Sequence, residues 1–169
     1  KLPEKDQKFL YDVAAQGEQR ILCLDQITDV HNGAAILRTA AFYGIKTVVL
    51  PGKNSFGETP TYFRIASGAH EYLNLIKVNN LAKTVTKLKE IGVMTIGLSE
   101  HADETLDTKM VKSNPGGVAL VLGKEETGIS HAVMRVLEHK MSITTQGQIK
   151  SLNVSVAAAV SMEKCFGDS

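Results

Sequence analysis

Three short segments of the sequence carry polar residues of the types and spacing that binding or catalysis requires. The first covers residues 25–44, "DQITDVHNGAAILRTAAFYG", in which Arg38 follows Asn32 by six residues within an Ala-rich helical pattern. Six residues are nearly two helical turns, so the arginine could point back toward the loop before the helix. Asn32 by itself fits a helix N-cap and Arg38 fits a surface ion pair, so structural and ligand-binding roles are both open here.

The second segment, residues 118–130, is an apolar strand pattern followed by a glycine turn, "VALVLGKEETGIS". Glycine lets a backbone approach a ligand closely, and N–H groups in such a turn can donate hydrogen bonds. A nucleotide-binding P-loop is excluded, because Val118 and Glu125 occupy the positions of its first glycine and its Ser or Thr. Glu125 alone fits a first-turn carboxylate that the helix dipole stabilises.

The third segment, residues 146–160, joins a polar run to an apolar helical run, "QGQIKSLNVSVAAAV". Ser151 and Asn153 could begin the helix or could form the floor of a site. No G-x-S-x-G turn accompanies Ser151, which argues against a hydrolase nucleophile. No G-x-G-x-x-G follows the first strand pattern, which argues against a dinucleotide site.

The elements that must position these segments alternate between strand and helix, which predicts an α/β domain with a mostly parallel sheet flanked by helices. The expected strands cover 20–25, 46–51, 72–78, 93–99, 117–123 and 140–143. The expected helices cover about 32–43, 59–68, 80–91, 129–138 and 153–166. Residues 100–116 are polar and predict a loop with at most one short helix. Polar residues after the ends of parallel strands favour a ligand site at that edge of the sheet.

Composition limits the class of protein. The chain has 169 residues, of which 43% are apolar and 22% charged, and this indicates a globular domain. Its apolar runs are too short to span a membrane, and no signal peptide is recognisable, so we expect a cytoplasmic protein. A net charge of +1 argues against binding of nucleic acid by bulk charge alone. Cys23 and Cys165 lack metal-ligand spacing, so we expect two reduced core thiols and no metal.

Together and in this order, the three segments resemble the motifs of the SpoU/TrmH-type RNA ribose 2'-O-methyltransferases of the SPOUT superfamily. The likeness covers roughly residues 20–165, and "RIASGAHEYL" at 64–73 resembles a further family segment. The resemblance implies a six-stranded sheet whose carboxy-terminal segment forms a deep trefoil knot, an exception to the rule that chains avoid knots. It also implies S-adenosylmethionine bound in the knot, an RNA substrate, and a homodimer with the active site at the subunit interface.

The resemblance assigns roles to residues that match the motifs. The implied active-site residues are Asn32, Arg38, Glu125, Ser151 and Asn153. The implied cofactor-binding residues are Leu122, Gly123, Ile143, Leu152 and Asn153. Two departures stand out, because the family usually has Asn-x-Gly-Ala where this chain has Asn32-Gly33-Ala34-Ala35, and often Ile-Pro-Met where this chain has Ile143-Thr144-Thr145.

A ribose 2'-hydroxyl is a weak acid and must lose its proton as the methyl group is transferred. Arg38 would stabilise the developing alkoxide, or accept the proton with help from an RNA phosphate; the first role is easier for a group that is nearly always protonated. Ser151 and Asn32 would orient the ribose and the arginine, and Glu125 would hold the network.

The leading hypothesis is therefore a methyltransferase that acts on a ribose of ribosomal or transfer RNA. The stretch at 68–88 favours a 23S rRNA guanosine substrate over tRNA, because it resembles the bacterial 23S rRNA guanosine enzymes of the family. Residues 1–19 are expected to be a linker or peripheral helix, or the end of an amino-terminal RNA-binding domain, with the catalytic domain at 20–169. A catalytically silent RNA-binding or assembly module on the same fold is the alternative, and base methylation fits the third motif less well.

Overall fold

The computed structural model describes residues 6–53, 55–69, 71–99, 107–124 and 128–167. Its centre is a six-stranded sheet with the order β3-β2-β1-β5-β4-β6, and every pairing is parallel. The strands are β1 (Arg20–Leu24), β2 (Thr47–Pro51), β3 (Asn74–Val78), β4 (Met94–Leu98), β5 (Val118–Leu122) and β6 (His139–Met141). The predicted α/β class with a six-stranded sheet is confirmed.

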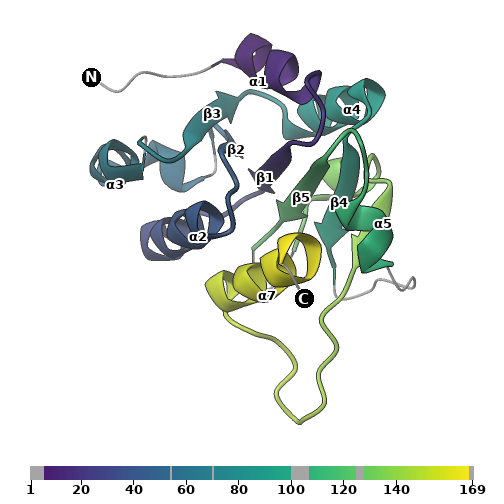
Figure 1. Ribbon diagram of the computed structural model, residues 1–169. Helices are drawn as coiled ribbons and strands as arrows, with labels where there is room; N and C mark the ends of the chain where they lie inside the picture. Colours follow the sequence, from purple (N-terminus) through teal and green to yellow (C-terminus); the bar gives the residue numbers. More distant parts are fainter. Residues whose placement is uncertain (1–5, 54, 70, 100–106, 125–127, 168–169) are drawn as a thin grey trace.

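Helices cover both faces of this sheet (Figure 1). They are α1 (Gln7–Ala14), α2 (Val30–Phe42), α3 (Tyr62–Ala69), α4 (Leu81–Ile91), α5 (Thr108–Lys112), α6 (His131–Met134) and α7 (Val154–Phe166), with a 3₁₀ turn, η1, at Phe56–Glu58. The central strands are buried on both faces, so alternate residues of one strand belong to two different cores. Leu22 and Leu24 of β1 pack with α2, α5 and α7, whereas Ile21 and Cys23 pack with α1, α4 and α6.

Helices α2 and α7 pack against each other on one face, so the first and third motif segments are neighbours in space (Figure 1). The Tyr43 hydroxyl donates a hydrogen bond of 2.9 Å to the Glu163 carboxylate. Arg20 donates to the Tyr43 carbonyl oxygen at 2.6 Å, and its guanidinium lies 5.5 Å from the centre of the Phe166 ring. These contacts hold the carboxyl-terminal end of α2 against α7 and β1.

Two predicted helices differ from the structure. The helix expected at 129–138 is a single turn, His131–Met134, because the chain must turn back to enter β6. Thr95 stabilises that turn, since its hydroxyl oxygen accepts the Glu138 N–H at 3.0 Å and its own N–H donates to the Glu138 carboxylate at 3.2 Å. The helix expected from residue 59 begins at Tyr62, after η1.

The segment at 1–19 contains α1, whose Leu10 and Ala14 are buried against α4 and β3. The short helix expected within 100–116 is α5, and residues 100–106 lie outside the described part of the chain. In the described residues, no helix has both the length and the apolar character needed to cross a membrane.

Candidate functional site

A pocket of about 410 Å³ lies at the carboxyl ends of β4 and β5, where a parallel sheet is expected to hold a ligand. This volume falls within the range of small-molecule sites. Its lining comes from the β5 turn, α6, β6, and the segment that leads into α7. The lining residues are Leu98, Ser99, Leu122, Gly123, Lys124, Gly128, Ile129, His131, Met134, Lys140, Ile143, Lys150, Ser151, Leu152, Val154 and Ala157.

Five residues that the resemblance implicated line this one pocket, namely Leu122, Gly123, Ile143, Ser151 and Leu152. They come from two motif segments some 20 residues or more apart in the chain, so the fold is what brings them together. Leu122 is buried at the end of β5, while Leu152 is 41% exposed at the pocket wall. Their binding roles stay predictions.

The turn after β5 is closed tightly on itself. Lys124 and Gly128 form an antiparallel bridge, and the Gly128 N–H donates to the Lys124 carbonyl oxygen at 2.8 Å. A Cβ atom at position 123 would collide with the Gly128 backbone, so the turn requires Gly123. Gly128 has a φ of +67°, which also favours glycine. Gly123 and Gly128 therefore bring the backbone of this turn to the pocket wall.

The segment before α6 is tied to the end of β1. The Asp25 carboxylate, which is 4% exposed, accepts the Ser130 N–H at 2.8 Å. Asp25 also donates its own N–H to the Leu122 carbonyl oxygen at 2.7 Å. Ile129 and His131 line the pocket on either side of Ser130, so the hydrogen bond to Asp25 holds this part of the pocket wall in place.

The amino-terminal cap of α2 is Asp29, and not Asn32. Its carboxylate accepts the N–H groups of His31 and Asn32 at 2.8 and 3.0 Å. These backbone hydrogen bonds, first that of Asn32 and then that of His31, hold the pKa of Asp29 below its usual value. The structural interpretation of Asn32 as an N-cap is therefore wrong, and its side chain, in the first turn of α2, is half-exposed.

Arg38 is exposed on α2, and neither Arg38 nor Asn32 lines the pocket formed by its own chain. No ion pair involves Arg38 among the described residues, so the surface salt bridge considered for it is absent there. Within one chain the structure thus separates the first motif's polar residues from the pocket of the second and third motifs. Glu125 lies outside the described residues.

Asn153 is the N-cap of α7, and its side-chain oxygen accepts the Ser155 N–H at 2.9 Å and the Ser155 hydroxyl at 2.6 Å. Asn153 itself is not among the residues that line the pocket wall, although its neighbours Leu152 and Val154 are. Before this wall, residues 144–150 form an arm that projects from the body of the molecule (Figure 1). Thr145 closes the arm, because its hydroxyl donates to the Ile149 carbonyl oxygen at 2.6 Å.

Sequence reasoning missed the basic residues of this pocket, which are Lys124, His131, Lys140 and Lys150. Two of them carried a usable signal, since Lys124 directly follows Gly123 and Lys150 directly precedes Ser151. His131 and Lys140 reach the pocket only through the short α6 and the edge strand β6. Among the described residues no group of three or more His, Cys, Asp or Glu side chains could hold a metal ion.

The chain matches the model of the SpoU rRNA Methylase family over residues 19–163 and belongs to that family. It is 36% identical over 146 residues to the 23S rRNA (guanosine-2'-O-)-methyltransferase RlmB of Nitrosomonas europaea, covering 86% of this chain and 55% of the relative. The corresponding enzyme of Ralstonia nicotianae is 38% identical over 145 residues, covering 86% of this chain and 57% of the relative. The chain therefore spans little more than half the length of these curated relatives.

Solved structures show the same fold. A structure described as a putative RNA methyltransferase of the TrmH family from Porphyromonas gingivalis superposes with a TM-score of 0.75 at 26% identity, covering 90% of this chain and 61% of that one. The two-motif pocket and the parallel sheet are thus set in a SpoU-type domain.

Proposed function

We propose that this chain is the catalytic domain of an S-adenosylmethionine-dependent methyltransferase that acts on a ribose 2'-hydroxyl of structured RNA, with a 23S rRNA guanosine favoured over tRNA. The pocket carries this proposal, because residues of the second and third motifs converge on it in a chain of the SpoU family. The curated relatives named above are 23S rRNA guanosine-2'-O-methyltransferases. Such an enzyme acts where the ribosomal RNA is, and we therefore expect it in the cytoplasm.

The residues present fit S-adenosylmethionine. Gly123 lines the pocket, and Leu98, Ile129 and Leu152 supply apolar surface for an adenine ring. A structure of an AdoMet-bound rRNA methyltransferase from Sinorhizobium meliloti has the same fold, with a TM-score of 0.79. When bound, the cofactor supplies a methyl group on a sulfonium. Leu122, Gly123, Ile143, Leu152 and Asn153 would hold it, and no metal is expected.

The chain's own residues would then activate and orient the ribose. Arg38 would stabilise charge on the 2'-oxygen as it loses its proton, a role that suits a permanently charged guanidinium. Ser151, exposed at the pocket wall, would orient the hydroxyl beside the cofactor site, with Asn32 and Glu125 holding the arginine. Alignment of the reacting atoms would provide much of the acceleration.

A homodimer would complete the site. Arg38 and Asn32 do not line their own chain's pocket, so a second copy would bring them to it. Apolar side chains are exposed near α2 and α7, as Phe42 is 82%, Ile149 78% and Val156 48% exposed. Such surface is more often covered by a partner than left in water. The trefoil knot that the resemblance implies stays a prediction.

The decisive test mixes two inactive variants, Arg38→Ala and Gly123→Val, after each alone is shown to be folded. If Arg38 of one copy serves the pocket of the other, half of the dimers are mixed and each has one intact site, so about a quarter of wild-type activity returns. No recovery, with mixed dimers shown by mass spectrometry, would place Arg38 and the pocket in one chain.

Cofactor binding is tested separately by calorimetry with S-adenosylmethionine. Binding by the wild-type chain, followed by mass-spectrometric mapping of a new 2'-O-methyl group on 23S rRNA, supports the proposal. No binding at millimolar cofactor would favour the catalytically silent RNA-binding module.

A further inference from the structure

Four basic residues from four different segments line the pocket. Lys124 follows β5, His131 begins α6, Lys140 lies in β6, and Lys150 directly precedes Ser151. No aspartate or glutamate is among the pocket-lining residues that the structure describes. The whole chain has a net charge of only +1, so this cluster of basic residues is a local feature and does not follow from composition.

Three of these four basic side chains face solvent. Lys124, His131 and Lys150 are exposed, whereas Lys140 is half-buried in the edge strand. Within the described ranges, no carboxylate forms an ion pair with Lys124, His131 or Lys150. Exposed lysines around an opening raise the local concentration of anions there.

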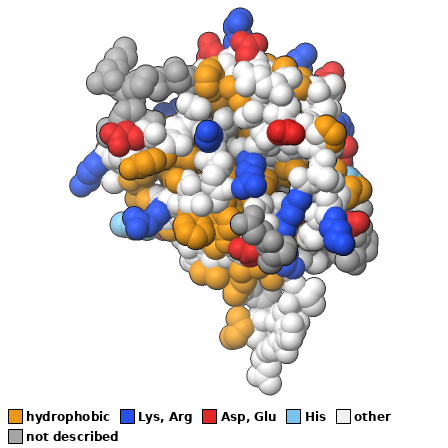
Figure 2. Space-filling view, in the orientation of Figure 1, with side chains coloured by type: hydrophobic (Ala, Val, Ile, Leu, Met, Phe, Trp, Pro, Cys, Tyr) orange, Lys and Arg blue, Asp and Glu red, His pale blue; other side chains and the backbone are white. Residues whose placement is uncertain are grey.

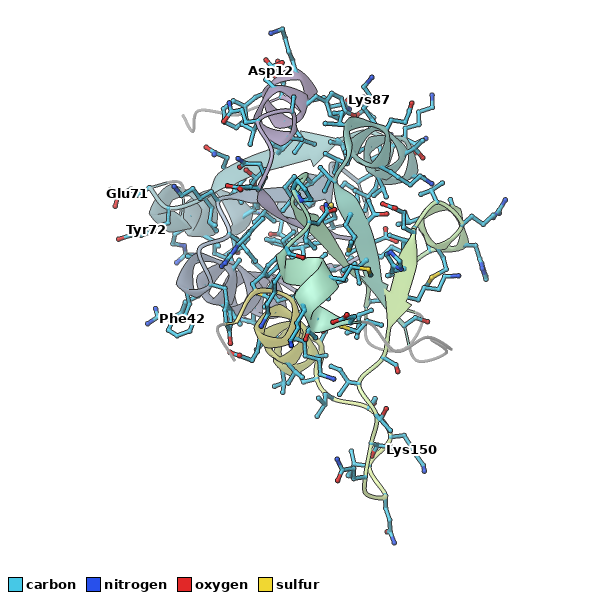
Figure 3. The ribbon with its side chains drawn as sticks, turned by 45° about the vertical axis from the view of Figure 1, so that its right-hand side comes forward. Asp12, Phe42, Glu71, Tyr72, Lys87 and Lys150 are labelled. Carbon is cyan, nitrogen blue, oxygen red and sulfur yellow. The ribbon has the colours of Figure 1, made fainter. Side chains whose placement is uncertain are left out.

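The arm at 144–150 extends this surface. Its residues are polar and uncharged apart from Ile149 and Lys150, and none of them is acidic. Figure 3 shows Lys150 on the projecting arm, at the end of the molecule opposite Lys87 of α4. Hydroxyl and amide groups of this kind donate hydrogen bonds to phosphate and sugar oxygens.

The cofactor alone does not account for so much charge. S-adenosylmethionine carries a sulfonium, an ammonium and a single carboxylate, so one cation would suffice for its anionic group. Three lysines around a ligand of net positive charge would otherwise be unfavourable. The excess positive charge matches a polyanion that passes over the pocket mouth.

We propose that Lys124, Lys150 and the adjoining His131 and Lys140 form a phosphate-binding rim, on which the RNA backbone next to the target ribose lies. This inference rests on the proposed function, because it takes the pocket below the rim as the cofactor site. Contacts to phosphate fix register without reading bases, so the rim sets the height and direction at which the ribose meets the pocket.

The test compares Lys124→Ala/Lys150→Ala with Lys83→Ala/Lys87→Ala, a matched pair of exposed lysines on α4. Dissociation constants for in vitro transcribed 23S rRNA are measured over a salt series, and cofactor affinity is measured by calorimetry. The rim variant should bind RNA roughly 10- to 100-fold more weakly at about 0.1 M salt. The slope of the logarithm of its binding constant against the logarithm of the salt concentration should be smaller in magnitude by about 1.4 to 1.8. The α4 variant should match wild type.

Two outcomes would overturn the rim. Unchanged RNA affinity and salt slope in the rim variant would remove the phosphate contacts. Loss of S-adenosylmethionine binding with unchanged RNA affinity would assign these lysines to the cofactor carboxylate instead. Failure of the proposed function gives a different result, because a chain without cofactor binding or methyl transfer would still show salt-dependent RNA binding through the rim.

Charges of both signs are mixed on the face of the molecule that Figure 2 presents. Figure 2 shows Lys and Arg side chains interspersed with Asp and Glu over the face it presents, with apolar side chains between them. A general loss of lysines there should therefore weaken RNA binding less than loss of the same number at the rim.

Discussion

The Asp25 carboxylate and the Ser130 backbone N–H are joined by a hydrogen bond of 2.8 Å, which connects the loop of the first motif to the wall of the pocket. Asp25 lies at the end of β1, four residues before the α2 cap Asp29, whereas Ser130 stands between two pocket-lining residues. A single buried acceptor thus couples the position of the Asn32 helix to the shape of the pocket.

Replacing Asp25 by alanine should weaken both stability and cofactor binding. The Ser130 N–H would lose its buried acceptor, which costs about 1 to 3 kcal/mol in the free energy of unfolding. If part of that loss appears as disorder of the wall, the Kd for S-adenosylmethionine should rise roughly tenfold. Urea unfolding and calorimetry measure the two effects.

Asp25→Asn tests whether the hydrogen bond or the charge matters, because its amide oxygen can still accept from Ser130. It should retain most of the cofactor affinity. Thr84→Val is the matched control, since Thr84 is equally buried and its hydroxyl bonds only within α4. Equal losses of cofactor affinity in Asp25→Ala and Thr84→Val would reduce the role of Asp25 to general stability.

Arg38→Ala should leave cofactor binding intact and nearly abolish methyl transfer. The side chain is exposed and lies outside its own chain's pocket, so its loss should not alter the fold. Removing one group that stabilises transition-state charge typically slows catalysis by about 100- to 1,000-fold. Arg38→Lys should recover only part of the rate, because lysine lacks the planar fork. Single-turnover transfer from radiolabelled cofactor provides the rate, and full activity in Arg38→Ala would remove this residue from the mechanism.

The parts of this molecule that sequence patterns predicted are those governed by local rules. Apolar runs of β-branched residues located β1, β2 and β5 within a residue or two, and the motif positions located the pocket wall at Gly123 and Leu152. The length of α6 was wrong because a long-range contact, Thr95 with Glu138, ends the helical pattern early.

The arrangement of the motif residues in space could not be predicted from the sequence. The resemblance assigns Arg38 and Ser151 to one site, yet Arg38 lies outside the pocket that Ser151 lines within one chain. The cluster of basic residues at the pocket was equally hidden in the sequence, because its four members come from four segments that meet only through the order of β5, β4 and β6.

The two cysteines should make the protein sensitive to alkali. Burial raises the pKa of Cys23 to about 12, helped by the nearby Asp25 charge, and burial raises that of Cys165 to about 12 against the opposing charges of Lys112 and Lys164. Unfolded thiols ionise near pH 9, whereas the folded thiols stay neutral. The contribution of each buried neutral thiol to the free energy of unfolding is complete below pH 9. It is lost as the pH rises toward 12, by up to about 1.4 kcal/mol per pH unit for each thiol.

Urea unfolding at pH 7, 8, 9, 10 and 10.5 measures this loss. Cys23→Ala should be less stable at pH 7 but should show a shallower decline above pH 9 than the wild-type protein. Stability that does not change between pH 8 and 10.5 would contradict the buried neutral thiols. In the native protein neither thiol should react with a disulfide reagent at pH 8.

Gly33→Ala should destabilise the start of α2, even though alanine is the better helix former. A Cβ atom at position 33 would lie 2.7 Å from carbons of the Phe56 ring, which is fully buried and has no room to move. Overpacking of this kind costs about 1 to 3 kcal/mol, which exceeds the gain of about 0.5 to 1 kcal/mol from replacing a helical glycine.

Gly68→Ala in α3 is the matched control, because a Cβ there would meet no atom within 4 Å. It should be neutral or stabilising by about 0.5 kcal/mol, while Gly33→Ala should lower the urea midpoint and, through its neighbour Asn32, the rate of methyl transfer. Adding Phe56→Leu to Gly33→Ala should restore part of both losses, since leucine leaves space for the new methyl group. A Gly33→Ala protein as stable as Gly68→Ala would show that the Phe56 ring can shift freely, and that the displaced glycine of the first motif has no packing role.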